Sequence, residues 1–138
     1  MKTAIRVTLL LLALLMSISF VACADVEETG AWESATYTSD KTLGKGEKTV
    51  TVKITAEEQT LTLTVKTDKA TLGEALREHE LIADDDGLIH TINGIKADYN
   101  DGGWWWKFTK NGEMMMVGAD DAAIADGEQY EFTRTNTF

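Results

Sequence analysis

The sequence predicts an α+β domain in which a mixed sheet of about five to six strands has one helix packed across it. Residues 49–55 and 60–67 both alternate apolar with polar side chains, which is typical of strands that bury one face. Residues 71–79 change to helical spacing of their apolar side chains. Aromatic and apolar segments separated by Asn-Gly and Asp-Gly turns follow, so further strands are expected after the helix.

The two alternating segments predict a β-hairpin, with residues 56–59 as its loop. Its buried positions are expected to be Val50, Val52, Ile54, Leu61, Leu63 and Val65. Upstream, residues 31–38 predict a short edge strand with Trp32 and Tyr37 as its aromatic content. Residues 39–48 are polar and contain Gly44 and Gly46, so this stretch is expected to be a loop.

The helix begins with a capping box, because the Thr71 side chain can accept from the Glu74 amide while Glu74 reaches back. One helical face carries Leu72, Ala75, Leu76 and His79. We expect the helix to end before Asp84 and to cover the apolar face of the hairpin.

The remaining strands are predicted from their turns. Residues 88–95 are predicted to form a strand that is broken or bent at Asn93-Gly94, and residues 104–109 form another after a glycine pair. Residues 110–113 fit a tight hairpin turn, residues 114–117 return, and residues 128–134 form the last strand, with Tyr130 and Phe132 on one face. A hairpin, a helix and then further strands is the order of a β-grasp fold.

The second half of the chain contains, in order, LGEAL, TINGI, WWWKF followed by KNGE, VGADD and DGEQYEF. This order resembles the C-terminal domain of transcobalamin and intrinsic factor, and the bacterial family of unknown function built on that domain. The resemblance implies a ligand-binding β-grasp domain, to which we assign residues 48–138. In transcobalamin and intrinsic factor the similar domain is one of two that enclose cobalamin. No helical partner is recognised here, so we expect a half-site that buries less of a corrinoid-like ligand.

Residues 1–22 are predicted to be a signal peptide, since Lys2 and Arg6 precede an apolar run at residues 7–16 and small residues follow. The run is too short for a stable membrane span. Residues 23–47 are then a tether with the edge strand.

Cys23 is the only cysteine and directly follows this segment. It resembles the lipobox cysteine of bacterial lipoproteins, which is acylated and becomes the new N-terminus, although Phe20 replaces the usual leucine. We therefore expect an extracytoplasmic protein attached to the bacterial cell membrane by a lipid anchor at Cys23. The sequence Ala22-Cys23-Ala24 also fits ordinary secretion, which stays open as the alternative.

The charge of the chain limits its partners. Removal of residues 1–22 leaves 11 basic residues against 23 acidic ones, a net charge of −12. This charge repels nucleic acid, so no nucleic-acid partner is expected.

An aromatic and methionine-rich hairpin is the candidate binding surface. Three consecutive tryptophans on a strand cannot share one face. Lys107 and Thr109 indicate a solvated face, which they share with Trp105, so Trp106 and Phe108 are expected in the core and Trp104 at its border. Methionines on the returning strand suit an adaptable surface. The predicted ligand surface is Trp104, Trp105, Tyr99, Met114, Met115 and Met116.

Acidic loops offer weaker metal candidates. Asp84, Asp85 and Asp86 are consecutive and lack the alternating spacing of an EF-hand loop, so a solvated loop is the simpler interpretation. Asp120 and Asp121 follow Gly118, where a structural turn is expected. We expect no specific structural cation.

Catalytic patterns are not found: the two histidines lack a nucleophile partner, and no phosphate-binding glycine loop, CxxC or HExxH occurs. The sequence therefore predicts a non-enzymatic binding module without a cofactor, whose partner is a small soluble ligand; the family resemblance implies a corrinoid-like one. The alternatives are a surface module that binds a protein or glycan, and a weak extracellular metal-binding protein.

Overall fold

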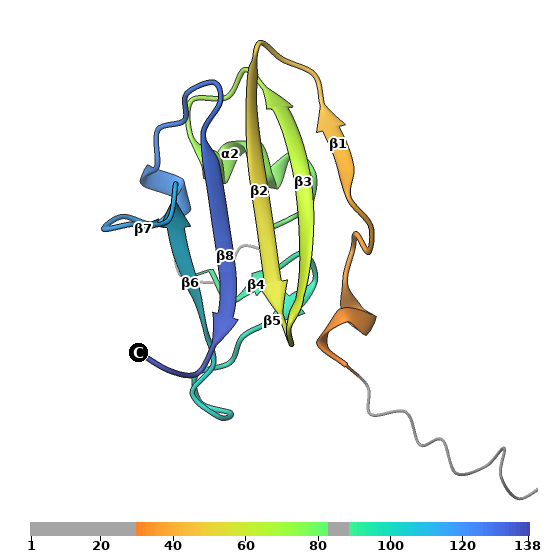
Figure 1. Cartoon of the computed structure of the whole chain (residues 1–138), viewed down its shortest axis with the longest axis vertical. Coiled ribbons are helices and arrows are strands. Elements are labelled where there is room, and N and C mark those ends of the chain that lie inside the picture. Colours follow the sequence, from red (N-terminus) through yellow and green to blue (C-terminus); the bar gives the residue numbers. More distant parts are fainter. Residues whose placement is uncertain (1–29, 83–88) are drawn as a thin grey trace, which may run out of the picture.

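The chain folds around a six-stranded mixed sheet with strand order β1-β3-β2-β8-β6-β7 (Figure 1). A computed structural model describes residues 30–82 and 89–138. The strands of the sheet are β1 (Lys41–Gly44), β2 (Lys48–Ala56), β3 (Gln59–Thr67), β6 (Trp105–Lys110), β7 (Glu113–Met114) and β8 (Gln129–Thr135). Together with α2 (Leu72–Arg77), the one α-helix in the described ranges, they confirm the predicted α+β class with a helix on a mixed sheet.

The β2–β3 hairpin is longer and tighter than expected. Its register runs from Lys48 opposite Thr67 to Ala56 opposite Gln59. Glu57 and Glu58 make the turn with φ angles of 51° and 65°, so a two-residue turn replaces the expected four-residue loop. The predicted alternation is confirmed, because every expected apolar position in both strands is buried.

Strand β8 runs parallel to β2 and antiparallel to β6, so it joins the first hairpin to the second one. A parallel pair requires a crossover connection. Here the crossover passes through α2 and a small hairpin, β4 (Thr91–Ile92) and β5 (Ile95–Lys96), both of which lie behind the sheet in Figure 1. No described element lies over the other face, which is turned toward the viewer in Figure 1 and which we call the outer face.

The capping box at the start of α2 is confirmed. The Glu74 amide donates to Thr71 Oγ1, and the Thr71 amide donates to Glu74 Oε2, each at 3.4 Å. The helix buries Leu72, Ala75 and Leu76 against the sheet, while His79 lies beyond its end. The core between helix and sheet also contains Tyr130 and Phe132 of β8, as their shared face predicted.

The N-terminal prediction was wrong in its elements. Residues 31–38 contain a 3₁₀ helix, η2 (Ala31–Ser34), and the edge strand β1 lies within the expected loop, parallel to β3. Side-chain anchors decide this arrangement: the Trp32 indole N–H donates to Ala56 O at 2.9 Å, and the Tyr37 amide donates to Asn93 Oδ1 at 2.8 Å. Such long-range bonds leave no mark in local periodicity.

The prediction for residues 88–95 was wrong as a single strand, although the break expected at Asn93-Gly94 is present. Within residues 89–96 the chain forms the β4–β5 hairpin, because Asn93 and Gly94 adopt φ angles of 54° and 77° and reverse it. Asn93 is fully buried, and its side chain both accepts from and donates to the Tyr37 backbone. The turn therefore also holds the N-terminal segment.

Three sequence predictions lie outside the described residues: the signal peptide at 1–22, the lipid attachment at Cys23, and the acidic residues Asp84, Asp85 and Asp86. Within the described ranges, no helix combines the length and hydropathy needed to traverse a bilayer.

Candidate functional site

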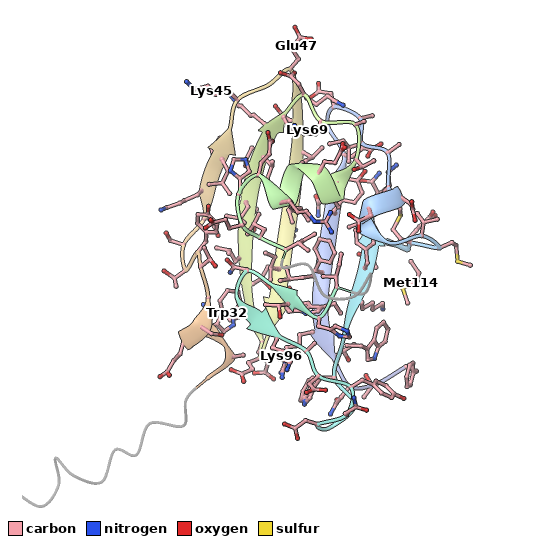
Figure 2. All side chains as sticks on the ribbon, turned by 180° about the vertical axis from the view of Figure 1, so that it is seen from behind. Trp32, Lys45, Glu47, Lys69, Lys96 and Met114 are labelled. Atoms are coloured by element: carbon pink, nitrogen blue, oxygen red, sulfur yellow. The ribbon has the colours of Figure 1, made fainter. Side chains whose placement is uncertain are left out.

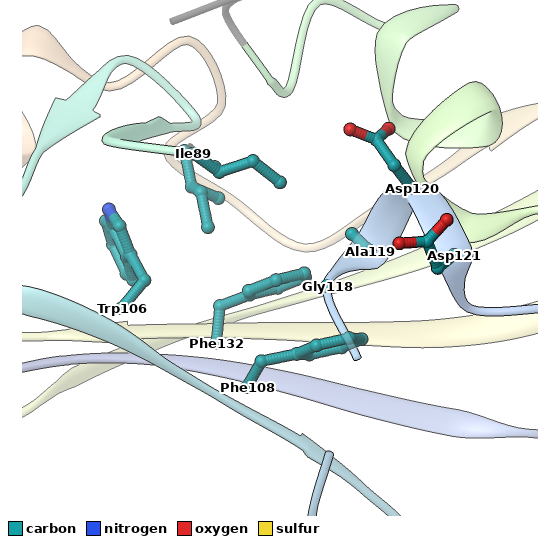
Figure 3. A pocket seen from close by; sticks show the side chains of 9 residues that line it. Ile89, Trp106, Phe108, Gly118, Ala119, Asp120, Asp121 and Phe132 are labelled. Atoms are coloured by element: carbon teal, nitrogen blue, oxygen red, sulfur yellow. The ribbon is translucent and has the colours of Figure 1, made fainter. Parts of the chain in front are cut away.

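A pocket of about 370 Å³ opens on the helix side of the sheet, between β6, β8, the β4 segment and the short helix η3 (Ala119–Asp121) (Figure 3). Its lining combines apolar walls with two carboxylates: Ile89, Ile92, Trp106, Phe108, Gly118, Ala119, Asp120, Asp121 and Phe132. Every one of these residues lies between positions 89 and 132, in the segment that carried the family resemblance.

The aromatic wall of the pocket is rigid. Phe108 and Phe132 are opposite each other in the β6–β8 register and stack with centroids 4.7 Å apart and planes 4° apart. The indole N–H of Trp106 donates to His90 O at 3.0 Å, which fixes the ring at the other end of the wall. Aromatic side chains held in this way are already ordered in the folded protein, so a ligand that binds them loses little free energy to side-chain ordering.

The acidic rim is held by α2. Arg77 binds both carboxylate oxygens of Asp120, with Nη2 3.1 Å from Oδ2. The hydrogen bonds from Arg77 hold the pKa of Asp120 below its usual value. The side chain of Asp121 is exposed and makes no hydrogen bond or ion pair with any described residue, so its charge is available to a ligand.

Two glycines give this rim its shape. A Cβ on Gly73 would collide with Asp120 Oδ1 and would lie 3.0 Å from Asp120 Cα, so only glycine lets η3 approach α2 this closely. Gly118, in contrast, has φ −74° and ψ 170°, and a Cβ there would meet nothing within 4 Å. A side chain at position 118 therefore has space beside the pocket and no backbone strain.

The methionines of the predicted surface are separated by the sheet. Met114 is opposite Thr109, so it is on the outer face, and Figure 2 shows it at the edge of the molecule. Met116 is 94% exposed, whereas Met115 packs against the core. None of the three lines the pocket.

The predicted aromatic residues lie at the other end of the hairpin. Arg134 lies over the Trp104 ring at 4.1 Å, and both line a second hollow with Asp98 and Lys96. Trp105 lies on the outer face and stacks on Phe138 with centroids 5.4 Å apart. Tyr99 is 59% exposed in the loop before β6. The six predicted residues thus do not converge on one site.

Sequence reasoning placed Trp106 and Phe108 in the core, and the structure gives them a second role, because both are half-buried and line the pocket. It did not single out Ile89 or Gly118 for binding. A signal for the rim was present, since Gly118 to Asp121 lie within the VGADD motif of the family resemblance.

A metal centre does not assemble in the described part of the chain. Among residues 30–82 and 89–138, no group of three or more His, Cys, Asp or Glu side chains gathers closely enough to hold an ion. Asp120, the carboxylate nearest to such a role in the pocket, already binds Arg77.

Comparison with known proteins supports the family resemblance. Residues 69–136 match the family described as a domain of unknown function (DUF4430). Among solved structures, a proposed metal-binding protein from Ruminococcus gnavus ATCC 29149 is similar with a TM-score of 0.62 and 29% identity, covering 67% of this chain and 100% of that one. Haptocorrin in complex with Cbi is similar with a TM-score of 0.49 and 18% identity, covering 70% of this chain and 27% of that one. Among curated proteins, none matches this chain.

Proposed function

Because residues 69–136 of this chain match the DUF4430 family, we propose that the protein is a non-enzymatic binding module that seats an apolar group of a soluble ligand in the pocket of Figure 3. The observation that carries this proposal is the location of the lining: all nine residues fall inside the family segment.

The chemistry of the pocket defines the group it accepts. Trp106, Phe108 and Phe132 provide flat apolar walls, so burial of a hydrocarbon or ring is favourable there. Asp121 adds a negative charge at the rim that is paired with none of the described residues. An apolar group joined to a cation or to a hydrogen-bond donor is therefore the best match. The resemblance to the transcobalamin domain makes a corrinoid-like compound a candidate ligand, and its amide groups would supply the hydrogen-bond donors.

The proposal includes a location. The apolar run and Cys23 support export and acylation, with the binding domain tethered outside the cell membrane. A Cys23→Ser variant should leave the membrane fraction while the wild-type protein stays in it. Wild-type protein that is soluble and begins at Asp25 would instead establish simple secretion.

A metal-binding function is the second candidate, and similarity to the whole of the R. gnavus protein favours it. Its weakness is the absence of a converging ligand set in residues 30–82 and 89–138. A third candidate, a surface module for proteins or glycans, would use the exposed aromatic residues around Trp104 and Trp105.

Titration of tryptophan fluorescence separates these functions, with cobinamide, a chitin oligosaccharide and calcium chloride as probes. The matched variants are Gly118→Leu, which adds a large side chain at a glycine of the pocket lining, and Gly30→Leu, which adds the same side chain at a non-strained glycine elsewhere. We expect cobinamide to change the fluorescence of wild type and Gly30→Leu but not of Gly118→Leu. A response to calcium alone, equal in all three proteins, would favour the metal-binding function instead.

A further inference from the structure

The edge of β6 is open beside the pocket. Strand β7 pairs with β6 only at Thr109 and Lys110, and the sheet order places no other described strand on that side. The Met115 amide donates to Phe108 O at 3.0 Å, so the peptide groups of Phe108 point toward β7. Because peptide groups alternate along a strand, those of Trp106 point to the same side, where no described strand pairs with them.

A ligand that pairs with the open edge would also reach the pocket. Trp106 lines the pocket with its side chain while its N–H and C=O face the open side of the strand. Residues opposite each other in neighbouring strands place their side chains on the same face of the sheet. A ligand residue paired with Trp106 would therefore direct its own side chain toward the pocket.

Charge at this edge favours a cationic partner. Asp121 at the rim and Glu113 at the start of β7 are both exposed, and neither side chain has a hydrogen bond or ion pair with a described residue. The whole chain carries a formal net charge of −10. A basic side chain beside the apolar group would meet complementary charge at the β7 end of this edge.

From these three features we propose that the ligand is an extended peptide segment that adds as a strand to β6 at Trp106, seats an apolar side chain in the pocket and carries flanking basic residues. This inference rests on the proposed function, since it uses the same pocket, and it names the ligand class. Main-chain pairing supplies affinity at the edge, and the pocket supplies selection of the side chain.

The test is a titration of the ¹⁵N-labelled protein with the peptide acetyl-Lys-Thr-Leu-Thr-Lys-amide. Binding is followed by the chemical shift of the Trp106 backbone amide. Leucine occupies the position opposite Trp106, so methylation of its nitrogen removes the donor to Trp106 C=O. We expect that methylation to weaken binding at least about tenfold. Methylation of the following threonine nitrogen, which points away from the edge, should change the affinity much less. Replacement of the peptide leucine by alanine should abolish binding, and Asp121→Asn should weaken it severalfold and reduce its salt dependence.

Several outcomes would overturn the inference, and they are distinct from failure of the proposed function. Equal affinity of the parent and leucine-methylated peptides would exclude strand pairing. Binding of cobinamide with no response to any peptide would leave a ligand pocket and remove the peptide ligand. If neither cobinamide nor peptide binds, or if Gly118→Leu binds both like wild type, the pocket function itself fails.

Discussion

Arg77 of α2 and Asp120 of η3 form a two-point ion pair that joins the only described α-helix to the rim of the pocket. Helix α2 is packed on the sheet through its buried leucines. The ion pair therefore fixes the position of η3 relative to the sheet. The close approach of Asp120 to Gly73 shows that this contact is sterically fitted as well as charged. The rim is therefore held by the helix rather than by its own loop.

The ion pair makes stability depend on acid pH. Asp120 has a folded pKa below its ordinary value near 3.8, so the pair stabilises the fold above that value and the gain is lost as pH falls through the folded pKa. We predict that Asp120→Asn costs less than about 1 kcal/mol at neutral pH, because the pair is half-exposed. Urea unfolding across pH 2–7 should show the difference from wild type shrinking below about pH 4. A difference that grows toward acid pH would contradict this assignment.

Gly73→Ala should destabilise the protein even though alanine is the better helix former. The added methyl group collides with Asp120 and forces η3 away from α2, which we expect to cost about 1–3 kcal/mol. Thermal unfolding measures the loss. Gly118→Ala is the matched control and should be nearly neutral, since its Cβ enters open space. Equal stability of the two variants would show that η3 does not pack closely on the helix.

Thr71→Ala should lower the free energy of unfolding by about 1 kcal/mol, because the Glu74 amide loses its acceptor. Thr71→Ser keeps the hydroxyl and should lose much less. The comparison requires only chemical denaturation of three proteins. Similar losses for alanine and serine would indicate that the methyl group, not the cap, stabilises this position.

The neighbouring tryptophans should differ in their contribution to stability. Trp106→Ala removes a ring packed on the core and its bond to His90, and should cost about 3 kcal/mol. Trp105 is on the outer face, and its buried indole nitrogen has no hydrogen-bond partner among residues 30–82 and 89–138, so Trp105→Phe should be nearly neutral. Denaturation midpoints of both variants provide the measurement. Loss of folding in Trp105→Phe with none in Trp106→Ala would reverse the assignment of faces.

Features set by neighbours in sequence could be predicted. The alternation at Val50 to Ile54, the capping box at Thr71 and the Asn111-Gly112 turn each follow from a few adjacent residues, and each is present. The strand at Lys41–Gly44 could not be predicted, since parallel pairing with β3 and the Asp40 bond to the Thr62 amide create it. Tertiary contacts there override a polar, glycine-containing sequence.

The candidate site was predictable in its chemistry but not in its location. Strand parity identified the face that Trp106 and Phe108 share. It could not indicate that this face stays partly open, because the opening depends on where η3 and Ile89 lie in space. The alternation of strand faces also could not predict that Met115 packs against the core whereas Met116 is exposed.

The most direct test of the central claim is a titration with benzylamine, a ring joined to a cation, followed by the Trp106 indole N–H signal in ¹H–¹⁵N spectra. We expect this signal to shift and saturate in wild type and in Gly30→Leu, because the ring enters the apolar pocket beside Asp121. The same signal should not respond in Gly118→Leu. Saturable binding in Gly118→Leu equal to that of wild type, or shifts confined to the indoles of Trp104 and Trp105, would contradict the claim that this pocket is the binding site.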